Sequence, residues 1–392
     1  MANARRNKKS SIFLNMSKYS FIPYGKQNID KNDINAVLKV LKSDFLTQGP
    51  KVLEFEQKLA KYCGVKYAIA CNSGTSALYL AYLVAGLKAG DEVITTPNTF
   101  VATSNMLLAI GVKPVFCDIR LDTYNINEKK IEKLITKKTK AIVPVHFAGQ
   151  PADMDKITRI AKKHKLLVIE DSCHALSAKY KNKKIGSISP MSVFSFHPVK
   201  NITTGEGGAI TTNNKNYYQK ILSLRSHGIK KDKKGFNIMT ELGYNYRLTD
   251  IQAALGVSQL KRLDEFTKKR YQIINWYQKE LSNIKDIILP QELPNLYSSW
   301  HLYVIRAKNP KLRDKLFAYL KEENISVNFH YPAVYSHPYY QKIGYKNTKL
   351  PNMETYHNSA ITLPLHTALT KKDIDYIASK IKFISSHTYY TH

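Results

Sequence analysis

The sequence has few cysteines and no long apolar run. Its four cysteines, Cys63, Cys71, Cys117 and Cys173, form no Cys-x-x-Cys pair, which argues against a zinc site of the usual spacing and against a disulfide framework. We expect buried or near-site thiols in a reducing compartment. No uninterrupted apolar stretch reaches the roughly 18 residues that a membrane-spanning helix needs, so we expect no membrane insertion.

Acidic residues are also scarce: 30 Asp and Glu stand against 60 Lys and Arg, a formal charge of +30. Such an excess can mark an anionic partner, such as a nucleic acid, a membrane surface or a phosphorylated substrate. A nucleic-acid module usually concentrates its charge on one element, however, and here the lysines occur singly or in twos throughout the chain. We therefore expect no nucleic-acid partner, and keep a non-catalytic basic binding protein as the alternative from another class.

The first two dozen residues contain no acid. Their apolar stretch, Ile12 to Leu14, is too short for the core of a secretory signal. We expect a basic extension over residues 1–23, with Met16 as a second possible start, on a cytoplasmic protein.

From residue 30 to about 260, short β-branched runs alternate with helical patterns. A loop followed by a helix is expected over 72–87, and helices are expected over 99–111 and 154–165. Strands are expected over 65–71, 91–97, 113–119, 141–147, 166–172, 192–197 and 207–213. This alternation predicts an α/β fold built on a mainly parallel, buried sheet of seven strands.

The pattern changes after the segment 248–281. Apolar residues keep helical spacing over 248–281, which predicts one long helix whose start is capped by Thr249 and Asp250. Beyond it, strands over 300–307 and 325–330 and helices over 313–324 and 371–385 indicate a small α+β domain. We expect a large domain over 24–264 and a small one over 265–392.

Three features follow strands of the expected sheet, where open α/β sheets bind ligands. CNSGTSAL (71–78) leads from a strand through a turn into a helix, and the N–H groups there can bind an anion, although an ordinary capped helix has the same pattern. IEDSCHAL (169–176) ends a buried strand at Asp171. A buried carboxylate there needs a cationic partner such as a protonated pyridine nitrogen, unless Asp171 only caps a turn.

The third feature is FSFHPVKNITTGEGGAI (194–210), in which Lys200 follows a strand and precedes a Gly-rich turn. Taken alone, Lys200 could be one more solvated surface lysine. A lysine in a cleft, however, can act as an amine nucleophile because desolvation lowers its pKa. A phosphate site, an acid for a ring nitrogen and a lysine for a Schiff base are together what pyridoxal 5'-phosphate (PLP) requires.

These motifs resemble the DegT/StrS class of sugar aminotransferases, a fold-type I PLP family. The likeness covers about residues 24 to 390. The segments that carry it are NSGTSAL, TTPNTFVAT, IEDSCHALSAKY, FSFHPVKNITTGEGGA, LRSHGI, LGYNYRLTDIQAALG and SSWHLYVI.

The resemblance implies roles for individual residues. Lys200 would hold the cofactor covalently, Asp171 would face the ring nitrogen, and His174 would lie near the phenolic oxygen. Phe100 would stack on the ring. The phosphate contacts implied are Gly74, Thr75, Ser195 and, from the second subunit of a homodimer, Asn245. The sugar-nucleotide contacts implied are Thr47, His330 and Tyr331. No metal is implied.

The resemblance also implies a reaction. Members that dehydrate at C3 carry His at the lysine position, whereas this chain has Lys200, with His197 three residues earlier, so transamination with glutamate or glutamine as donor is expected. KSDFLTQGP, RSHGI and VNFHYP resemble the members that aminate UDP-2-acetamido-2,6-dideoxy-β-L-arabino-hexos-4-ulose on the way to pseudaminic acid. Pro332 directly follows Tyr331, where those members tend to have one residue between, so the sugar-side loop is expected to differ. The alternatives are other nucleotide-sugar C4 or C3 aminotransferases of the viosamine, perosamine or bacillosamine type.

Overall fold

A seven-stranded sheet organises the larger body of the molecule, which the computed structural model describes over residues 20–387. Its strands are β1 (Tyr67–Cys71), β2 (Glu92–Thr95), β3 (Lys113–Phe116), β4 (Thr139–Val143), β5 (Leu167–Asp171), β8 (Met191–Ser195) and β9 (Gly208–Thr212). They lie in the order β1-β9-β8-β5-β4-β2-β3, and β9 runs antiparallel to both its neighbours while the other pairs are parallel. The predicted mainly parallel sheet of seven strands is confirmed.

Alternate strand residues enter two hydrophobic cores, one on each face of the sheet. Ile69 and Val93 belong to one core, and their neighbours Ala68 and Ile94 belong to the other. The helices that pack on the first face are α3 (Gly74–Val84), α4 (Ala102–Leu108) and α7 (Lys215–Arg225). Those on the second are α2 (Pro50–Cys63), α6 (Met154–His164) and α8 (Asp250–Lys261). Each strand is therefore buried on both sides, as a parallel sheet requires.

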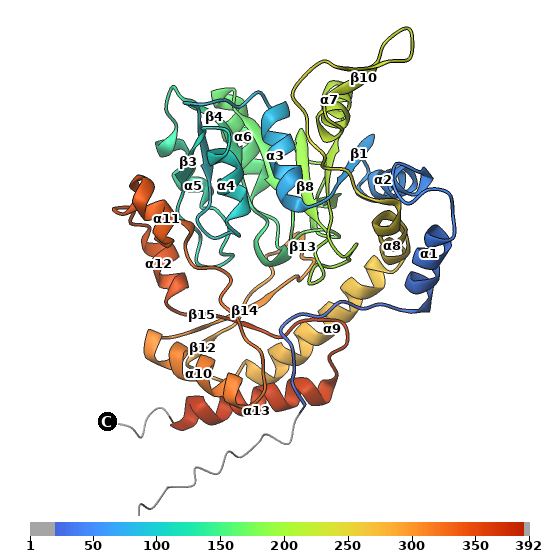
Figure 1. The fold of residues 1–392 in the computed structure, drawn as a ribbon. Coiled ribbons are helices and arrows are strands. Elements are labelled where there is room, and N and C mark those ends of the chain that lie inside the picture. The colour runs from blue at the N-terminus through green and yellow to red at the C-terminus, as the bar shows by residue number, and fades with distance from the viewer. Residues whose placement is uncertain (1–19, 388–392) are drawn as a thin grey trace, which may run out of the picture.

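A smaller lobe lies below the sheet in Figure 1, and α9 (Leu263–Leu281) runs into it from the larger body. Its antiparallel sheet has the order β12-β14-β15, with bounds Ile287–Ile288, Tyr303–Ala307 and Ala360–Leu363. The helices α10 (Pro310–Glu322) and α13 (Lys371–His387) complete it. The N-terminal Ile22 is buried in this lobe's core. The limits proposed for the two domains stay a prediction.

Shorter elements complete the described chain. The remaining helices are α1 (Lys31–Leu41), α5 (Glu128–Ile131), α11 (Pro338–Tyr340) and α12 (Pro351–His357). The remaining strands are β6 (Lys179–Tyr180), β7 (Lys183–Lys184), β10 (Ile229–Lys231), β11 (Asn237–Met239) and β13 (Leu296–Tyr297). The strands β13, β6 and β7 form a small sheet, and β10 pairs with β11 in a hairpin.

Two expectations about the second half of the chain are wrong. The long helix expected over 248–281 is two helices, because the backbone at Arg262 leaves helical geometry (φ −101°, ψ 1°) between α8 and α9. Arg262 there reaches the carboxylates of Asp30 and Asp33. The strand expected over 325–330 is an extended segment with isolated bridges only, Ile325 to Ile22 and Asn328 to Thr362. Thr249 does cap α8, in a capping box with Gln252.

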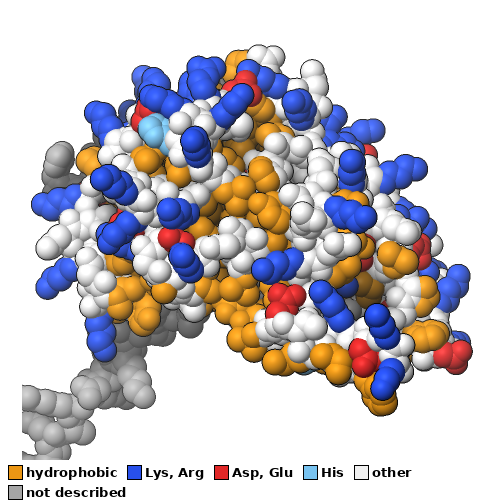
Figure 2. Space-filling model, turned by 90° about the horizontal axis from the view of Figure 1, so that it is seen from above, with side chains coloured by type: hydrophobic (Ala, Val, Ile, Leu, Met, Phe, Trp, Pro, Cys, Tyr) orange, Lys and Arg blue, Asp and Glu red, His pale blue; other side chains and the backbone are white. Residues whose placement is uncertain are grey.

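The excess of basic residues is spread widely over the face shown in Figure 2, where Lys and Arg side chains lie among neutral and hydrophobic ones with few acids.

Within residues 20–387, no helix combines the length and apolar character that crossing a membrane demands. The same residues contain no group of three or more His, Cys, Asp or Glu side chains placed to hold a metal ion. All four cysteines are free, and three of them are buried. The basic extension predicted over 1–23 lies mostly outside the described residues.

Candidate active site

A cavity of about 650 Å³ opens beyond the carboxyl ends of β5 and β8, against residues 328–332 in the segment after α10. It brings together most of the residues predicted for the site. Its walls include Gly74, Thr75, Phe100, Asp171, His174, Ser195, Lys200, His330 and Tyr331. Nine of the residues that the sequence predicted for the site therefore line one cavity.

Two predicted residues, Thr47 and Asn245, are exposed and lie outside this lining. Thr47 forms an isolated bridge with Thr249 at the start of α8, and Asn245 forms one with Ser226. The roles predicted for them stay predictions.

Lys200 lies in the loop after β8, where its backbone N–H donates to the carbonyl of His197 at 2.9 Å. Burial lowers the pKa of its ammonium group, against the opposing effect of Cys173 and Asp171. A lowered pKa leaves more of the free amine at neutral pH, which is the form that can attack a carbonyl or accept a proton.

Asp171 is the last residue of β5 and is buried. Its Oδ2 accepts a hydrogen bond from the Thr103 hydroxyl at 2.7 Å, and its Oδ1 accepts one from the N–H of Cys173 at 3.2 Å. Both donors are neutral. A buried carboxylate held this way is fixed in direction and suited to a cationic group bound in the cavity.

The N-terminus of α3 forms another wall of the cavity. Ser73 caps the helix by accepting a hydrogen bond from the Ser76 N–H at 3.1 Å. The first N–H groups of a helix, here those of Gly74 and Thr75, have no acceptor within the helix and favour an anion. A Cβ at position 74 would lie 3.0 Å from Cβ of Ser195, so a larger residue would crowd the approach to this anion site.

Three histidines lie around Tyr331. The ring of His174 packs against that of His301 with centroids 4.4 Å apart, and His174 Nε2 lies 3.1 Å from Tyr331 Oη. Burial lowers the pKa of His174 well below its ordinary value and that of His330 to about 3. These imidazoles are therefore neutral at pH 7 and act as hydrogen-bonding groups rather than as charges.

The residues fit PLP. Asp171 offers a charged partner for a ring nitrogen, the start of α3 offers N–H groups for a phosphate, and Lys200 offers a nucleophilic amine. Nδ1 of His174 is buried without a partner among residues 20–387, which leaves it available to a bound group. Phe100, whose side chain is 58% exposed, has its ring centroid 6.2 Å from that of Tyr331, so an aromatic face is available at the same wall.

Sequence reasoning missed several residues of the site. Thr103 positions Asp171 and also lies 2.7 Å from the Thr99 hydroxyl. Tyr24 lines the cavity from the N-terminal segment, and His301 lines it from the link before β14. The spacing of Thr99 and Thr103, four residues apart at the start of a helix, was a usable signal. Nothing local marks Tyr24, because only the tertiary fold brings it to His330, at 5.5 Å between ring centroids.

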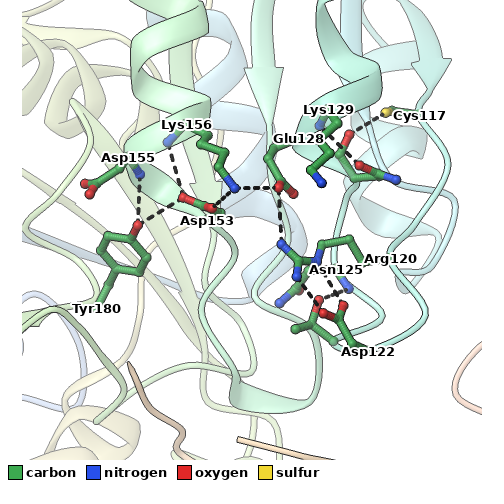
Figure 3. A network of polar contacts seen from close by, with 12 residues as sticks. Cys117, Arg120, Asp122, Asn125, Glu128, Lys129, Asp153, Asp155, Lys156 and Tyr180 are labelled. Carbon is green, nitrogen blue, oxygen red and sulfur yellow. Dashed lines mark hydrogen bonds and ion pairs between the residues drawn. The ribbon is translucent and has the colours of Figure 1, made fainter. Parts of the chain in front are cut away.

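A second cavity, of about 290 Å³, lies at the start of α6, and Figure 3 shows the polar network beside it. Glu128 accepts from Arg120 at 3.2 Å and from Lys156 at 3.0 Å, and Lys156 also pairs with Asp153 at 2.8 Å. The pair of Lys156 with Glu128 links α6 to α5.

Comparison with known proteins agrees with this geometry. The model of the DegT/DnrJ/EryC1/StrS aminotransferase family matches residues 27–382. A UDP-4-amino-4,6-dideoxy-N-acetyl-beta-L-altrosamine transaminase from Campylobacter jejuni is 43% identical over 362 residues, covering 91% of this chain and 95% of that protein.

Two solved structures have the same fold. Helicobacter pylori PseC, an aminotransferase of pseudaminic acid biosynthesis, has a TM-score of 0.90 at 37% identity, covering 94% of this chain and all of that one. The PLP form of the sugar aminotransferase Spr1654 from Streptococcus pneumoniae also has a TM-score of 0.90, at 31% identity and with 94% and 99% coverage.

Proposed function

The chain belongs to the DegT/DnrJ/EryC1/StrS aminotransferase family, and from this premise we propose that it moves an amino group from glutamate to the C4 ketone of UDP-2-acetamido-2,6-dideoxy-β-L-arabino-hexos-4-ulose. It is a PLP-dependent sugar aminotransferase. The membership rules out the alternative of a non-catalytic basic binding protein. The observation that carries the proposal is the single cavity that contains Lys200, Asp171, His174 and Tyr331.

The cofactor, when bound, supplies an electron-withdrawing ring that carries the amino group between the two substrates. The protein residues have separable tasks. The carboxylate of Asp171 would hold a proton at the ring nitrogen, and the N–H groups of Gly74 and Thr75 would bind the phosphate. Lys200 Nζ would anchor the cofactor and could then move a proton at the reacting carbon, a task that its lowered pKa favours.

The sugar side of the site would be formed by residues 328–332, which meet β15 through the bridge of Asn328 to Thr362. His330 Nδ1 lies 2.9 Å from the hydroxyl of Thr362 on that strand, and the neighbouring Tyr331 reaches His174. The 3.1 Å contact between Tyr331 and His174 supports a sugar side that adjoins the cofactor side of the site. The similarity to the C. jejuni transaminase and to PseC supports the proposed substrate.

A homodimer with shared active sites is part of the proposal. Large apolar side chains are exposed along α1 and the loop to α2, at positions Ile34, Leu38, Leu41, Phe45 and Leu46. A run of this kind marks an interaction surface. Asn245, exposed and outside its own chain's cavity, would contribute to the partner's phosphate site.

The experiment that tests the substrate is amination of a panel of UDP- and dTDP-linked 4-keto-6-deoxy sugars by the purified enzyme with glutamate, with products identified by mass spectrometry and NMR. We expect highest kcat/KM for the L-arabino UDP sugar. Preference for the C5 epimer or for a dTDP sugar would overturn the proposed substrate. Glutamine in place of glutamate tests the donor in the same assay.

A further inference from the structure

Ser299 is a fully buried residue of the segment 298–301, which links β13 to β14 at the junction of the large body and the small lobe. Its hydroxyl donates a hydrogen bond to the carbonyl of His174 at 2.6 Å. Its own carbonyl accepts one from Nδ2 of Asn201 at 2.8 Å. One residue therefore contacts two loops of the active site.

The two loops carry the two central groups of the proposed mechanism. Asn201 directly follows Lys200, and His174 is three residues beyond Asp171. The strands that lead to them, β8 and β5, are paired in parallel through Ile169, Glu170 and Asp171, but this ladder fixes the strands and not the loops after them. Ser299 supplies a link between the loops, through the backbone of one and the side chain of the other.

The segment that carries Ser299 is itself held from both sides. The N–H of Ser299 donates to the carbonyl of Gly149 at 3.0 Å. Gly149 has a φ of +99°, and a Cβ there would lie 2.4 Å from the Ser299 hydroxyl oxygen, so only glycine leaves room for this contact. From the small lobe, Nη1 of buried Arg270 on α9 donates to the carbonyls of Trp300 at 3.0 Å and His301 at 3.3 Å.

We infer that Ser299 is a positioning residue that sets the loop of Lys200 relative to the loop of Asp171 and His174. The inference rests on the proposed function, because it takes these loops to be the two sides of the cofactor site. Truncating Ser299 removes the bond to His174, and truncating Asn201 removes the bond that Ser299 receives from the lysine loop. Both changes should act on cofactor geometry rather than on sugar binding.

The test compares Ser299→Ala and Asn201→Ala with the control Ser298→Ala. Ser298 is equally buried, and its hydroxyl accepts from the N–H of Trp300 within the same segment. Each variant is measured for the dissociation constant of PLP, for the visible circular dichroism of the bound cofactor and for the rate of its reaction with glutamate alone. The melting temperature of the cofactor-free protein reports on folding.

For Ser299→Ala and Asn201→Ala we expect the PLP dissociation constant to rise and the glutamate rate to fall by about tenfold each, as for loss of one positioned hydrogen bond. The circular dichroism band should change, and KM for the sugar should stay within about twofold of wild type. Ser298→Ala should leave the PLP dissociation constant, the glutamate rate, the circular dichroism band and the KM for the sugar unchanged. If Ser299→Ala does not fold, Asn201→Ala decides the question.

The positioning role is overturned if Ser299→Ala and Asn201→Ala match Ser298→Ala in PLP affinity and circular dichroism. That failure differs from failure of the proposed function. A wild-type enzyme that binds PLP but does not react with glutamate or aminates another sugar would refute the donor or the substrate. The affinity and dichroism measurements would still decide the role of Ser299.

Discussion

The hydroxyl of Tyr331 lies 3.1 Å from Nε2 of His174. Tyr331 belongs to the segment proposed to bind the sugar, and His174 to the loop after β5 that carries Asp171. Burial raises the pKa of Tyr331 and lowers that of His174, so both are neutral and the bond is not an ion pair. A hydrogen bond thus joins the proposed sugar side of the cavity to the proposed cofactor side.

Replacing Tyr331 by Phe removes this bond and keeps the ring. We expect kcat/KM for the sugar to fall about tenfold, since His174 Nε2 is left without its partner in a buried place. Steady-state kinetics check this, with Tyr339→Phe, at an exposed tyrosine, as the matched control. Equal kcat/KM values for the two variants would mean that the hydrogen bond between Tyr331 and His174 does not contribute to the reaction with the sugar.

Lys200→Ala should abolish turnover. The change removes both the covalent anchor of the cofactor and the amine that moves the proton, and general acid–base catalysis alone is worth about 10² to 10⁴ in rate. The wild-type protein should show a visible absorption band. Borohydride should remove this band and leave the cofactor covalently attached to the protein, whereas the variant should show neither effect. Lys137→Ala, at an exposed lysine, should keep both properties. Multiple turnover at the wild-type rate in Lys200→Ala would refute the assignment.

Asp171→Asn keeps the shape of the side chain and removes its charge. We expect kcat to fall by about 10² or more, because the proton at the cofactor's ring nitrogen loses its counter-charge. The hydrogen bond from Thr103 can persist, so the melting temperature should change little. Pre-steady-state measurement of the glutamate reaction is the direct assay, and Asp155→Asn on the surface is the control. A kcat within threefold of wild type would contradict the role.

The stability of the fold should decline as pH falls below about 6.5. His330 has a pKa of about 3 in the folded chain, against an ordinary value of 6.5. Between these values the unfolded chain binds a proton that the folded chain does not, so stability is full above 6.5 and is lost as pH falls. His330 alone should remove about 1.4 kcal/mol between pH 7.5 and 5.5.

Urea unfolding at the two pH values measures this loss. In His330→Gln, the loss of unfolding free energy between pH 7.5 and pH 5.5 should be smaller than in wild type by about 1.4 kcal/mol. An unchanged difference would show that His330 takes up its proton equally in both states.

The shared active site can be tested by complementation. Lys200→Ala and Asn245→Ala should each be inactive or strongly impaired alone. If Asn245 serves the partner's site, a hybrid dimer has one intact site, and an equimolar re-equilibrated mixture should recover about a quarter of wild-type activity. Recovery is measured after mixing under conditions that allow subunit exchange, confirmed with differently tagged chains. Exchange without recovered activity would place Asn245 in its own chain's site or outside any site.

The sequence alone predicted the sheet and the chemical core of the cavity. Short β-branched runs are typical of buried strands. All seven strands of the main sheet lie within the predicted ranges, except that β4 begins two residues earlier than predicted and β8 one residue earlier. Lys200, Asp171 and Gly74 lie in local motifs directly after or between these strands, and parallel strands bring their carboxyl ends to one edge. The alternation of strands and helices predicted a mainly parallel sheet, and such a sheet brings these three residues together.

Only the tertiary structure decided the rest. Apolar spacing continues through Arg262, so periodicity cannot detect that contacts with Asp30 and Asp33 accompany a break in the helix there. The segment 325–330 has strand-like residues, yet its pairing depends on Ile22 and Thr362, each distant in the chain. Tyr24 lines the cavity, and Ser299 contacts the loops of His174 and Lys200, for the same reason: both come from chain segments far from the motifs. Local residue patterns determine elements and their chemistry, whereas the contacts between remote segments determine how those groups are held.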